Sequence, residues 1–132
     1  MNENNKKLIK EAEKTRKIAY TPYSKFNVGA AILTTDGKVF TGCNIENASF
    51  GLTICAERVA IFKAISEGSS KFKAIAIVGD TEKPCSPCGS CRQVISEFGE
   101  DIDVIMSNLK GEIKIKKIFE LLPDAFSKKD IL

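Results

Sequence analysis

The 132-residue sequence contains no histidine. This absence excludes mechanisms that need a histidine base, such as the Ser-His-Asp triad and the Cys-His pair, and it excludes every histidine-based metal site. A metal ion would have to be held by thiolates or carboxylates. A general base would have to be Glu, Asp, Lys, Tyr or Cys.

Long apolar runs and a strong excess of one charge are missing as well. No apolar run approaches the roughly 18 residues needed to span a bilayer, and the polar first residues are not followed by the apolar stretch of a signal peptide. We therefore expect a cytoplasmic protein without a membrane partner. The net charge is only +3, and nucleic-acid binders carry a clustered basic face that is not evident here. We expect no nucleic-acid partner.

The sequence does contain five cysteines. An odd number of cysteines in a reducing compartment argues against a disulfide framework and favours metal binding or catalysis. With 43% hydrophobic and 28% charged residues the composition is that of an ordinary globular protein. We expect a single domain that spans residues 1–132.

The hydrophobic pattern predicts an alternation of helices and strands. The predicted helices cover 4–20, 54–67, 87–98 and 117–122, and the predicted strands cover 27–34, 38–43, 74–79, 102–106 and 112–116. This order predicts an α/β fold: a three-layer α/β/α sandwich with a central mixed five-stranded sheet. The second helix is apolar on nearly all sides, so we expect it to be buried on more than one side, as at a subunit interface.

Two segments carry candidate chemistry, and each begins a predicted helix: Thr-Ile-Cys-Ala-Glu-Arg at 53–58 and Ser-Pro-Cys-Gly-Ser-Cys-Arg-Gln at 86–93. We expect Thr53 and Ser86 to cap the two helices, which places Cys55 and Cys88 at the second helical positions. Helix N-termini favour anions, so thiols there should have lowered pKa values. Cys91 follows three residues after Cys88 and shares its helix face.

The number of available ligands leaves three interpretations open. Structural zinc is normally closed by four protein ligands, whereas catalytic zinc keeps three and leaves one position for water. Cys43 or Cys85 could complete a closed four-thiolate site. Cys88 and Cys91 could instead form a redox pair.

Glu57 favours the open catalytic site. A carboxylate beside water bound to zinc can take up a proton and return it to a substrate. In a regular helix Glu57 would lie about 200° around the axis from Cys55, so both can reach one metal only from the end of the helix. Arg58 or Arg92 could donate hydrogen bonds to the sulfurs and offset the negative charge of three thiolates.

The same residues resemble the motifs of the small homotetrameric zinc-dependent cytidine deaminases. The resemblance rests on Cys-Ala-Glu-Arg at 55–58 and Pro-Cys-Gly-Ser-Cys-Arg-Gln at 87–93. It extends over nearly the whole chain, through Tyr-Ser-Lys-Phe at 23–26, Val-Gly-Ala-Ala at 28–31, Gly-Cys-Asn-Ile-Glu-Asn-Ala at 42–48, and Leu-Leu-Pro at 121–123 with Phe126.

The resemblance implies a reaction, a metal and an assembly. The reaction is the hydrolytic deamination of cytidine and 2′-deoxycytidine to uridine and 2′-deoxyuridine, with release of ammonia, as in pyrimidine salvage. One zinc ion per subunit would be held by Cys55, Cys88 and Cys91, Glu57 would move protons, and Arg58 would support the sulfurs. The subunits would form a homotetramer whose active sites are completed by neighbouring subunits.

The resemblance also implies how a nucleoside is held. Phe26 would pack near the nucleoside, and Asn44 and Glu46 would bind the ribose hydroxyls. Phe126 would reach a neighbouring subunit's site and stack on the base. The implied substrate residues are Phe26, Asn44, Ile45, Glu46, Ala56 and Phe126.

Two residues depart from the family pattern: Phe50 stands where the family often has tyrosine, and Cys85 is outside its ligand set. Four alternatives remain. They are a deaminase of another aminopyrimidine such as blasticidin S, a nucleotide or polynucleotide deaminase, a structural zinc module, and a redox dithiol protein. The pair Asn44 and Glu46 favours a substrate with a ribose, and Cys55 and the mild charge argue against the polynucleotide alternative.

Overall fold

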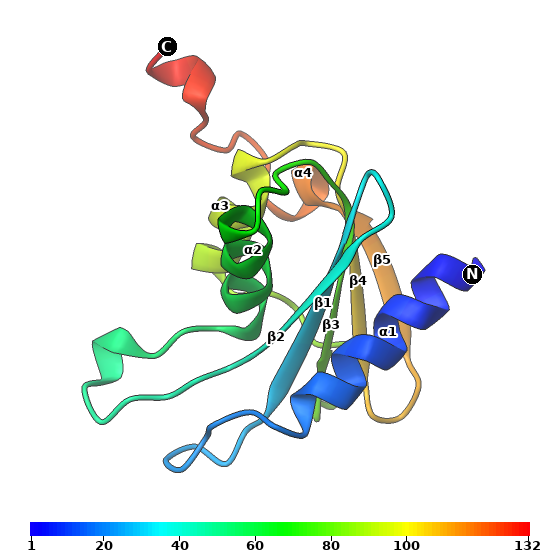
Figure 1. The fold of residues 1–132 in the computed structure, drawn as a ribbon, viewed down its shortest axis with the longest axis vertical. Helices are drawn as coiled ribbons and strands as arrows, with labels where there is room; N and C mark the ends of the chain where they lie inside the picture. The colour runs from blue at the N-terminus through cyan, green and yellow to red at the C-terminus, as the bar shows by residue number, and fades with distance from the viewer.

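The structure, a computed structural model that describes residues 1–132, is built on one mixed sheet with helices on both faces (Figure 1). In sheet order the five strands are β2 (Val39–Cys43), β1 (Val28–Thr34), β3 (Phe72–Gly79), β4 (Asp103–Asn108) and β5 (Ile113–Lys117). Only β3 and β4 are parallel, and the other three pairings are antiparallel. The helices are α1 (Glu3–Arg16), α2 (Ala56–Ser66), α3 (Gly89–Glu97) and α4 (Ile118–Leu121), with 3₁₀ turns at Phe50–Leu52 and Lys128–Asp130.

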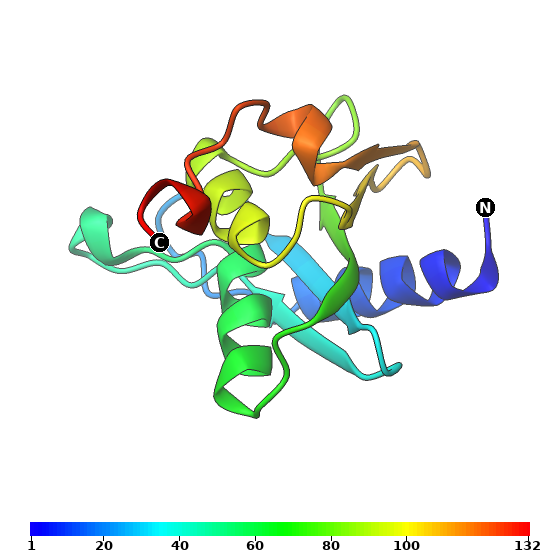
Figure 2. The same ribbon diagram turned by 90° about the horizontal axis from the view of Figure 1, so that it is seen from above.

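The alternation of side chains along the strands divides the core into two layers. On one face Leu8 and Ala12 of α1 pack against residues such as Ala31. On the other face α2 and α3 pack against residues such as Ala30 and Ile32. Figure 2 shows α1 on the opposite side of the sheet from α2 and α3. The predicted three-layer α/β/α sandwich with a mixed five-stranded sheet is confirmed.

The first helix is shorter than the predicted range 4–20, because α1 ends at Arg16. Beyond α1 the backbone of Tyr20 pairs with a segment far away in the sequence. The Tyr20 N–H donates to the Asn44 carbonyl at 3.0 Å, and the Glu46 N–H donates to the Tyr20 carbonyl at 2.8 Å. Helical propensity continues past residue 16, but these long-range hydrogen bonds override it. Lys17, Ile18 and Ala19 still donate to carbonyl oxygens three residues earlier, so the helix ends in tight turns before the chain departs at Tyr20.

The predicted helix caps are wrong by two residues in both cases. Cys55 is the N-cap of α2 and Cys88 is the N-cap of α3. Thr53 and Ser86 are used elsewhere, because the Thr53 hydroxyl accepts the Asn47 N–H and the Ser86 hydroxyl bonds to a methionine sulfur. Neither cysteine side chain caps its helix. Each thiol therefore stands just outside the helix end, free to bind something else.

Helix α2 lies very close to the edge of the sheet. A Cβ atom on Gly42 in β2 would come within 2.5 Å of the Ala56 carbonyl oxygen and of the Ala60 nitrogen. Only glycine permits this approach. Within one subunit the helix is buried on one side only, and Phe62 on it is 46% exposed. None of the helices has both the length and the apolar character needed to cross a membrane.

Candidate metal centre

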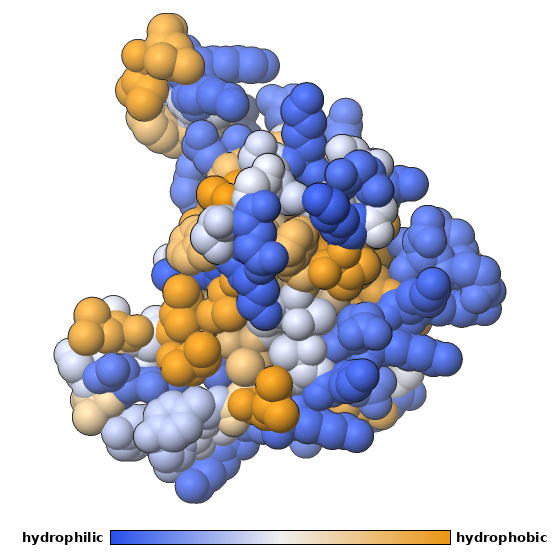
Figure 3. Space-filling model, in the orientation of Figure 1, coloured by the Kyte–Doolittle hydropathy of each residue, from blue (hydrophilic) through white to orange (hydrophobic).

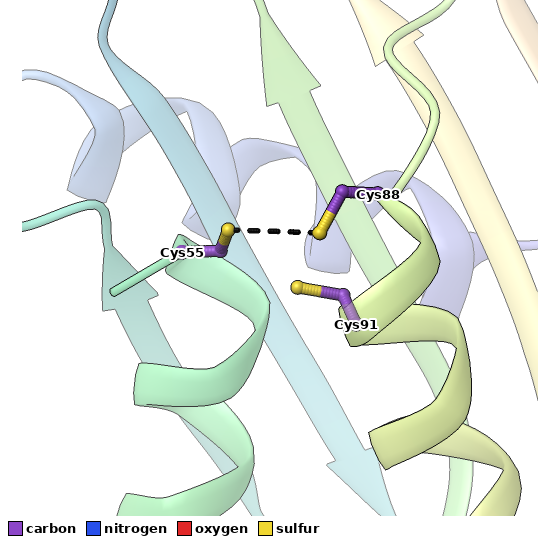
Figure 4. Close-up of side chains that lie close together, drawn as sticks. All are labelled: Cys55, Cys88 and Cys91. Carbon is purple, nitrogen blue, oxygen red and sulfur yellow. Dashed lines mark hydrogen bonds between the residues drawn. The ribbon is translucent and has the colours of Figure 1, made fainter. Parts of the chain in front are cut away.

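Three cysteine sulfurs meet where the N-terminal ends of α2 and α3 face each other (Figure 4). All three sulfurs lie within 4.8 Å of one another, and the Sγ atoms of Cys55 and Cys88 are 3.9 Å apart. Cys91, on the first turn of α3, points into the same space. A tetrahedral zinc ion with Zn–S bonds of about 2.3 Å would hold its sulfurs about 3.8 Å apart. The cluster therefore fits three ligands of one zinc ion.

The electrostatics of the cluster favour a cation. Hydrogen bonds from Cys91, Arg58 and Cys88 stabilise a thiolate at Cys55 and lower the pKa of that thiol to about 5. The pKa of Cys91 is raised, because its thiol is hydrogen-bonded to Cys55 and is buried. Three ionised sulfurs this close together repel one another unless a positive ion lies between them. Zinc binding, which requires deprotonated thiols, resolves this conflict.

The cluster contains three cysteines and no fourth. Neither Cys43 nor Cys85 belongs to the group of sulfurs that converge there. Burial raises the pKa of Cys43, and it raises the pKa of Cys85 to about 11. Their exclusion rests on position, because neither sulfur reaches the point where the other three meet. This arrangement argues against the closed four-thiolate site and matches the three-ligand pattern of catalytic zinc.

Glu57 lies directly behind the cysteine cluster. It is the second residue of α2 and is only 4% exposed. Burial and the neighbouring Cys55 raise the pKa of its carboxyl group to about 7. Because Cys55 is the N-cap and not a helical residue, the helical separation expected between Cys55 and Glu57 does not apply. The Glu57 carboxyl group is close enough to the cluster to interact with Cys91 by a hydrogen bond and with Cys55 through its charge.

The two arginines of the motifs have different partners. Arg58 donates from Nη2 to the Cys55 sulfur at 3.4 Å. Its Nε is buried and has no hydrogen-bond partner in the subunit. Arg92 instead donates to the Pro87 and Leu121 carbonyl oxygens, each at 2.9 Å. Arg58 is therefore the arginine that can offset thiolate charge, and Arg92 fixes the chain before α3.

The segment expected to hold the sugar enters the site beside Cys55. Ile45 pairs with Ile54 through two backbone hydrogen bonds of 3.0 Å each. This bridge places the residues on either side of Ile45 next to the chain that leads into α2. Ala56, the first residue of α2, is fully buried.

Asn44 and Glu46 both hold the loop that follows α1. Asn44 accepts the Val28 N–H at 2.9 Å and donates to the Phe26 carbonyl at 2.8 Å. Glu46 accepts the backbone N–H groups of Tyr23 and Ser24 at 3.0 and 3.2 Å, and it also accepts the Ser24 hydroxyl. The sequence motif drew attention to Asn44 and Glu46 as sugar ligands, but it did not reveal this loop-holding role or the part of Ser24 in it.

Phe26 approaches the wall of the site at the end of β3. A Cβ atom built on Gly79 would lie 2.9 Å from the Cys85 sulfur and 3.4 Å from Cζ of Phe26. Gly79 thus leaves the space that these two side chains fill. The sequence offers Cys85 only as a possible fourth metal ligand, and no motif singles out Gly79. Their proximity follows from strand register, which the sequence alone does not display.

Phe126 lies between α4 and the 3₁₀ turn at Lys128–Asp130. It is 62% exposed, and it lies on a C-terminal segment that runs away from the sheet (Figure 1). The Phe126 carbonyl accepts a hydrogen bond from the Gln93 side chain at 2.8 Å. A cavity of about 540 Å³ near this segment is lined by residues of α3, α4 and the C-terminus, none of which is a predicted site residue.

Comparison with known proteins decides the family. The family described as the cytidine and deoxycytidylate deaminase zinc-binding region matches residues 2–107. The chain belongs to this family. A cytidine deaminase of Sporosarcina psychrophila is 56% identical over 126 residues, which are 95% of this chain and 93% of the relative.

The structural comparison agrees. The crystal structure of a cytidine deaminase from Burkholderia pseudomallei superposes on this deaminase with a TM-score of 0.90 at 50% identity, covering 96% of this chain and 100% of the other. A blasticidin-S deaminase of Bacillus cereus is 34% identical over 108 residues and covers 76% of each chain. Zinc is the metal of this family, and the three-cysteine cluster is the group in this structure that can hold it.

Proposed function

We propose that this deaminase hydrolyses cytidine and 2′-deoxycytidine to uridine and 2′-deoxyuridine, releasing ammonia. The observation that carries the proposal is a buried carboxyl group, that of Glu57, beside three converging thiolates. Its relatives named cytidine deaminase support the choice of substrate. They match the chain more closely and over more of its length than the antibiotic deaminase does.

In this proposal Cys55, Cys88 and Cys91 hold zinc, and Glu57 moves the protons. When bound, zinc supplies a Lewis acid that lets water lose a proton near neutral pH. Glu57 takes that proton and delivers it to N3 of the base as the water oxygen bonds to C4. It then takes the second proton of that water from the new C4 hydroxyl and delivers it to the amino nitrogen, so that the C4–N bond breaks, ammonia leaves and a carbonyl oxygen remains at C4. A carboxyl group with a pKa of about 7 can both accept and donate protons at neutral pH.

The nucleoside is held on the side of the site formed by the first loop and the end of β2. Asn44 and Glu46 bind the ribose hydroxyls, Phe26 packs against the nucleoside, and Ile45 and Ala56 complete the wall. The hydrogen bonds that Asn44 and Glu46 make to the loop leave each with unused capacity. A sugar hydroxyl can therefore bind without breaking the loop.

We further propose a homotetramer in which Phe126 stacks on the base in a neighbouring subunit's site. The support is apolar surface left uncovered in the single chain: Figure 3 shows orange patches on one face, and the rings of Phe62 on α2 and of Phe126 are exposed. Five free thiols, three of them needed for metal binding, also suit the reducing cytoplasm. We propose this compartment as the protein's location.

The decisive experiment follows the absorbance loss of cytidine and the release of ammonia by the zinc-loaded protein. Glu57→Gln, checked for equal zinc content, should lower kcat by about 10²–10⁴-fold. Exposed Glu82→Gln serves as a matched control and should change nothing. Turnover of blasticidin S but not cytidine would replace the proposed substrate, and a fully active Glu57→Gln would refute the proton shuttle.

Mixing two defective variants tests the shared site. Glu57→Gln and Phe126→Ala are each expected to be impaired alone. If the two residues act in one site from different subunits, dissociating and reassembling the variants together restores part of the activity. No recovery from verified mixed assemblies would contradict the role of Phe126.

A further inference from the structure

The loop between α1 and β1 is held by side chains and not by regular secondary structure. Glu46 Oε1 accepts two of its backbone N–H groups, and Glu46 Oε2 accepts the Ser24 hydroxyl. Ser24 Oγ in turn accepts the Phe26 N–H at 3.0 Å. A short chain of hydrogen bonds therefore runs from the backbone of Phe26 through Ser24 to the carboxylate of Glu46.

Phe26 is held from its other side by Asn44, which binds its carbonyl oxygen at 2.8 Å. Between Ser24 and Phe26 the backbone of Lys25 adopts a left-handed conformation with φ of 61°. A non-glycine residue pays a conformational cost there, so it persists only where its neighbours are fixed. The hydrogen bonds of Ser24 and Asn44 provide that fixation.

An acceptor count shows what remains for a ligand. A carboxylate offers about four lone-pair positions. The two N–H groups and the Ser24 hydroxyl fill three of them, and the remaining position is on Oε2, the oxygen that Ser24 holds. Because the Ser24 hydroxyl binds this same oxygen, it sets the direction in which the remaining lone pair of Oε2 points.

We propose that Ser24 is a positioning residue for the sugar side of the site. Its hydroxyl orients the Glu46 carboxylate toward a ribose hydroxyl. Ser24 does not touch the reacting atoms. This inference rests on the proposed function, because it takes Glu46 as a sugar ligand.

The test compares two ligands that differ only in the sugar hydroxyls. KM and kcat are measured with cytidine as the substrate. The affinity for 2′,3′-dideoxycytidine is measured as its inhibition constant in competition with cytidine. Wild-type protein, Ser24→Ala and Ser24→Thr are used after zinc content and oligomeric state have been shown to be equal. The threonine variant retains the hydroxyl at this exposed position.

For Ser24→Ala we expect the KM for cytidine to rise about tenfold with kcat changed by less than about twofold, because the lost hydrogen bond acts on binding remote from C4. The inhibition constant of 2′,3′-dideoxycytidine should change by less than about twofold, since it has no hydroxyl for Glu46 to bind. Ser24→Thr should stay within about threefold of wild type.

The outcomes separate this inference from the proposed function. An equal loss for both ligands would make Ser24 a merely structural residue and overturn the inference, as would an unchanged KM or a failure of Ser24→Thr to recover. In each of these cases cytidine turnover by the wild-type protein leaves the proposed function intact. Absence of cytidine turnover by the zinc-loaded wild type would overturn both.

Discussion

The metal end and the sugar end of the site are built in contrasting ways. Two of the cysteine sulfurs belong to the N-caps of regular helices and the third to the first turn of α3, and the neighbouring Glu57 is buried. The loop that carries Phe26 is exposed and irregular, and its shape depends on side-chain acceptors. The proposed metal ligands and Glu57 are thus positioned by regular backbone and close packing, whereas the residues proposed to bind the sugar are positioned by a few hydrogen bonds.

This comparison predicts that changes at the metal end cause large losses, and that changes at the loop cause small, ligand-dependent ones. The largest effect is expected for Cys88→Ala. Loss of residues that only support a ligand typically costs 10–100-fold in metal affinity, so loss of a ligand should cost more than about 100-fold. The loss of zinc affinity is measured as the zinc content after dialysis, and the loss of activity as the rate of cytidine turnover. Cys43→Ala, outside the cluster, should keep both, and a Cys88→Ala protein that retains one zinc per subunit would contradict the assigned ligands.

The next largest effect is expected from Gly42→Ala, which tests the packing that places α2. The new Cβ would meet backbone atoms of α2 at 2.5 Å, and backbone cannot turn away as a side chain can. We expect a loss of about 1–3 kcal/mol or more in the free energy of unfolding, together with weaker zinc binding. Urea unfolding gives the first quantity. Gly51→Ala is the control, because nothing lies within 4 Å of its Cβ position, and similar losses in both variants would refute the packing argument.

A smaller effect is expected from Arg58→Ala. The hydrogen bond from Arg58 to the Cys55 sulfur stabilises the thiolate, so its loss should weaken zinc binding by about 10–100-fold and raise the pKa of Cys55. Competition with a zinc chelator measures the affinity. Arg58→Lys keeps the charge but loses the planar donor geometry, and it should recover only part of the affinity. An unchanged zinc affinity in Arg58→Ala would show that the hydrogen bond from Arg58 to Cys55 contributes nothing to zinc binding.

The smallest effect concerns the loop and its dependence on pH. The pKa of Glu46 is lowered mainly by the hydrogen bond from the Ser24 hydroxyl. The backbone N–H groups of Ser24 and Tyr23 lower it further. A carboxyl pKa that is lower in the folded than in the unfolded state stabilises the folded state at pH values above the unfolded pKa of about 4.3. This stabilisation is lost as the pH falls through the folded-state pKa. We therefore expect wild type to be slightly more stable than Ser24→Ala at neutral pH.

That difference should shrink as the solution is made acidic. Unfolding of the two proteins at a series of pH values measures it, and NMR titration of the Glu46 carboxyl shows the pKa moving up in Ser24→Ala. Acid release of zinc affects both proteins alike and cancels in the difference. A stability difference that is independent of pH would contradict the assigned cause.

The sequence predicted the order of elements and the sheet well, because the alternation of apolar and polar residues reports directly on helices and strands. It failed where tertiary contacts prevail over local preference. The predicted first helix runs to residue 20, but Tyr20 pairs with the segment around Ile45 and the regular helix ends at Arg16. Thr53 and Ser86 look like helix caps, but their hydroxyls are engaged by other parts of the chain.

The same division holds for the candidate site. The convergence of the three cysteines could be predicted because the residue types and their spacing restrict what they can do, and the same motifs drew attention to Glu57 and to two arginines, of which the fold brings Arg58 to a sulfur. The roles of Ser24 and Gly79 could not, since a serine and a glycine suit many positions. Their importance appears only through the register that brings Glu46 to the loop and Phe26 to the end of β3.

By itself the sequence determined which chemistry is possible, because a chain without histidine and with three suitably spaced cysteines and a neighbouring glutamate leaves few catalytic options. Tertiary structure decided the geometry that this chemistry uses. It placed Cys55 and Cys88 at the helix caps and excluded Cys43 and Cys85 from the cluster, and it used the carboxylate of Glu46 to hold a loop. The physical reason is that residue type fixes charge and ligand preference locally, whereas distances between segments far apart in the chain are set by packing and hydrogen bonds that form only in the folded protein.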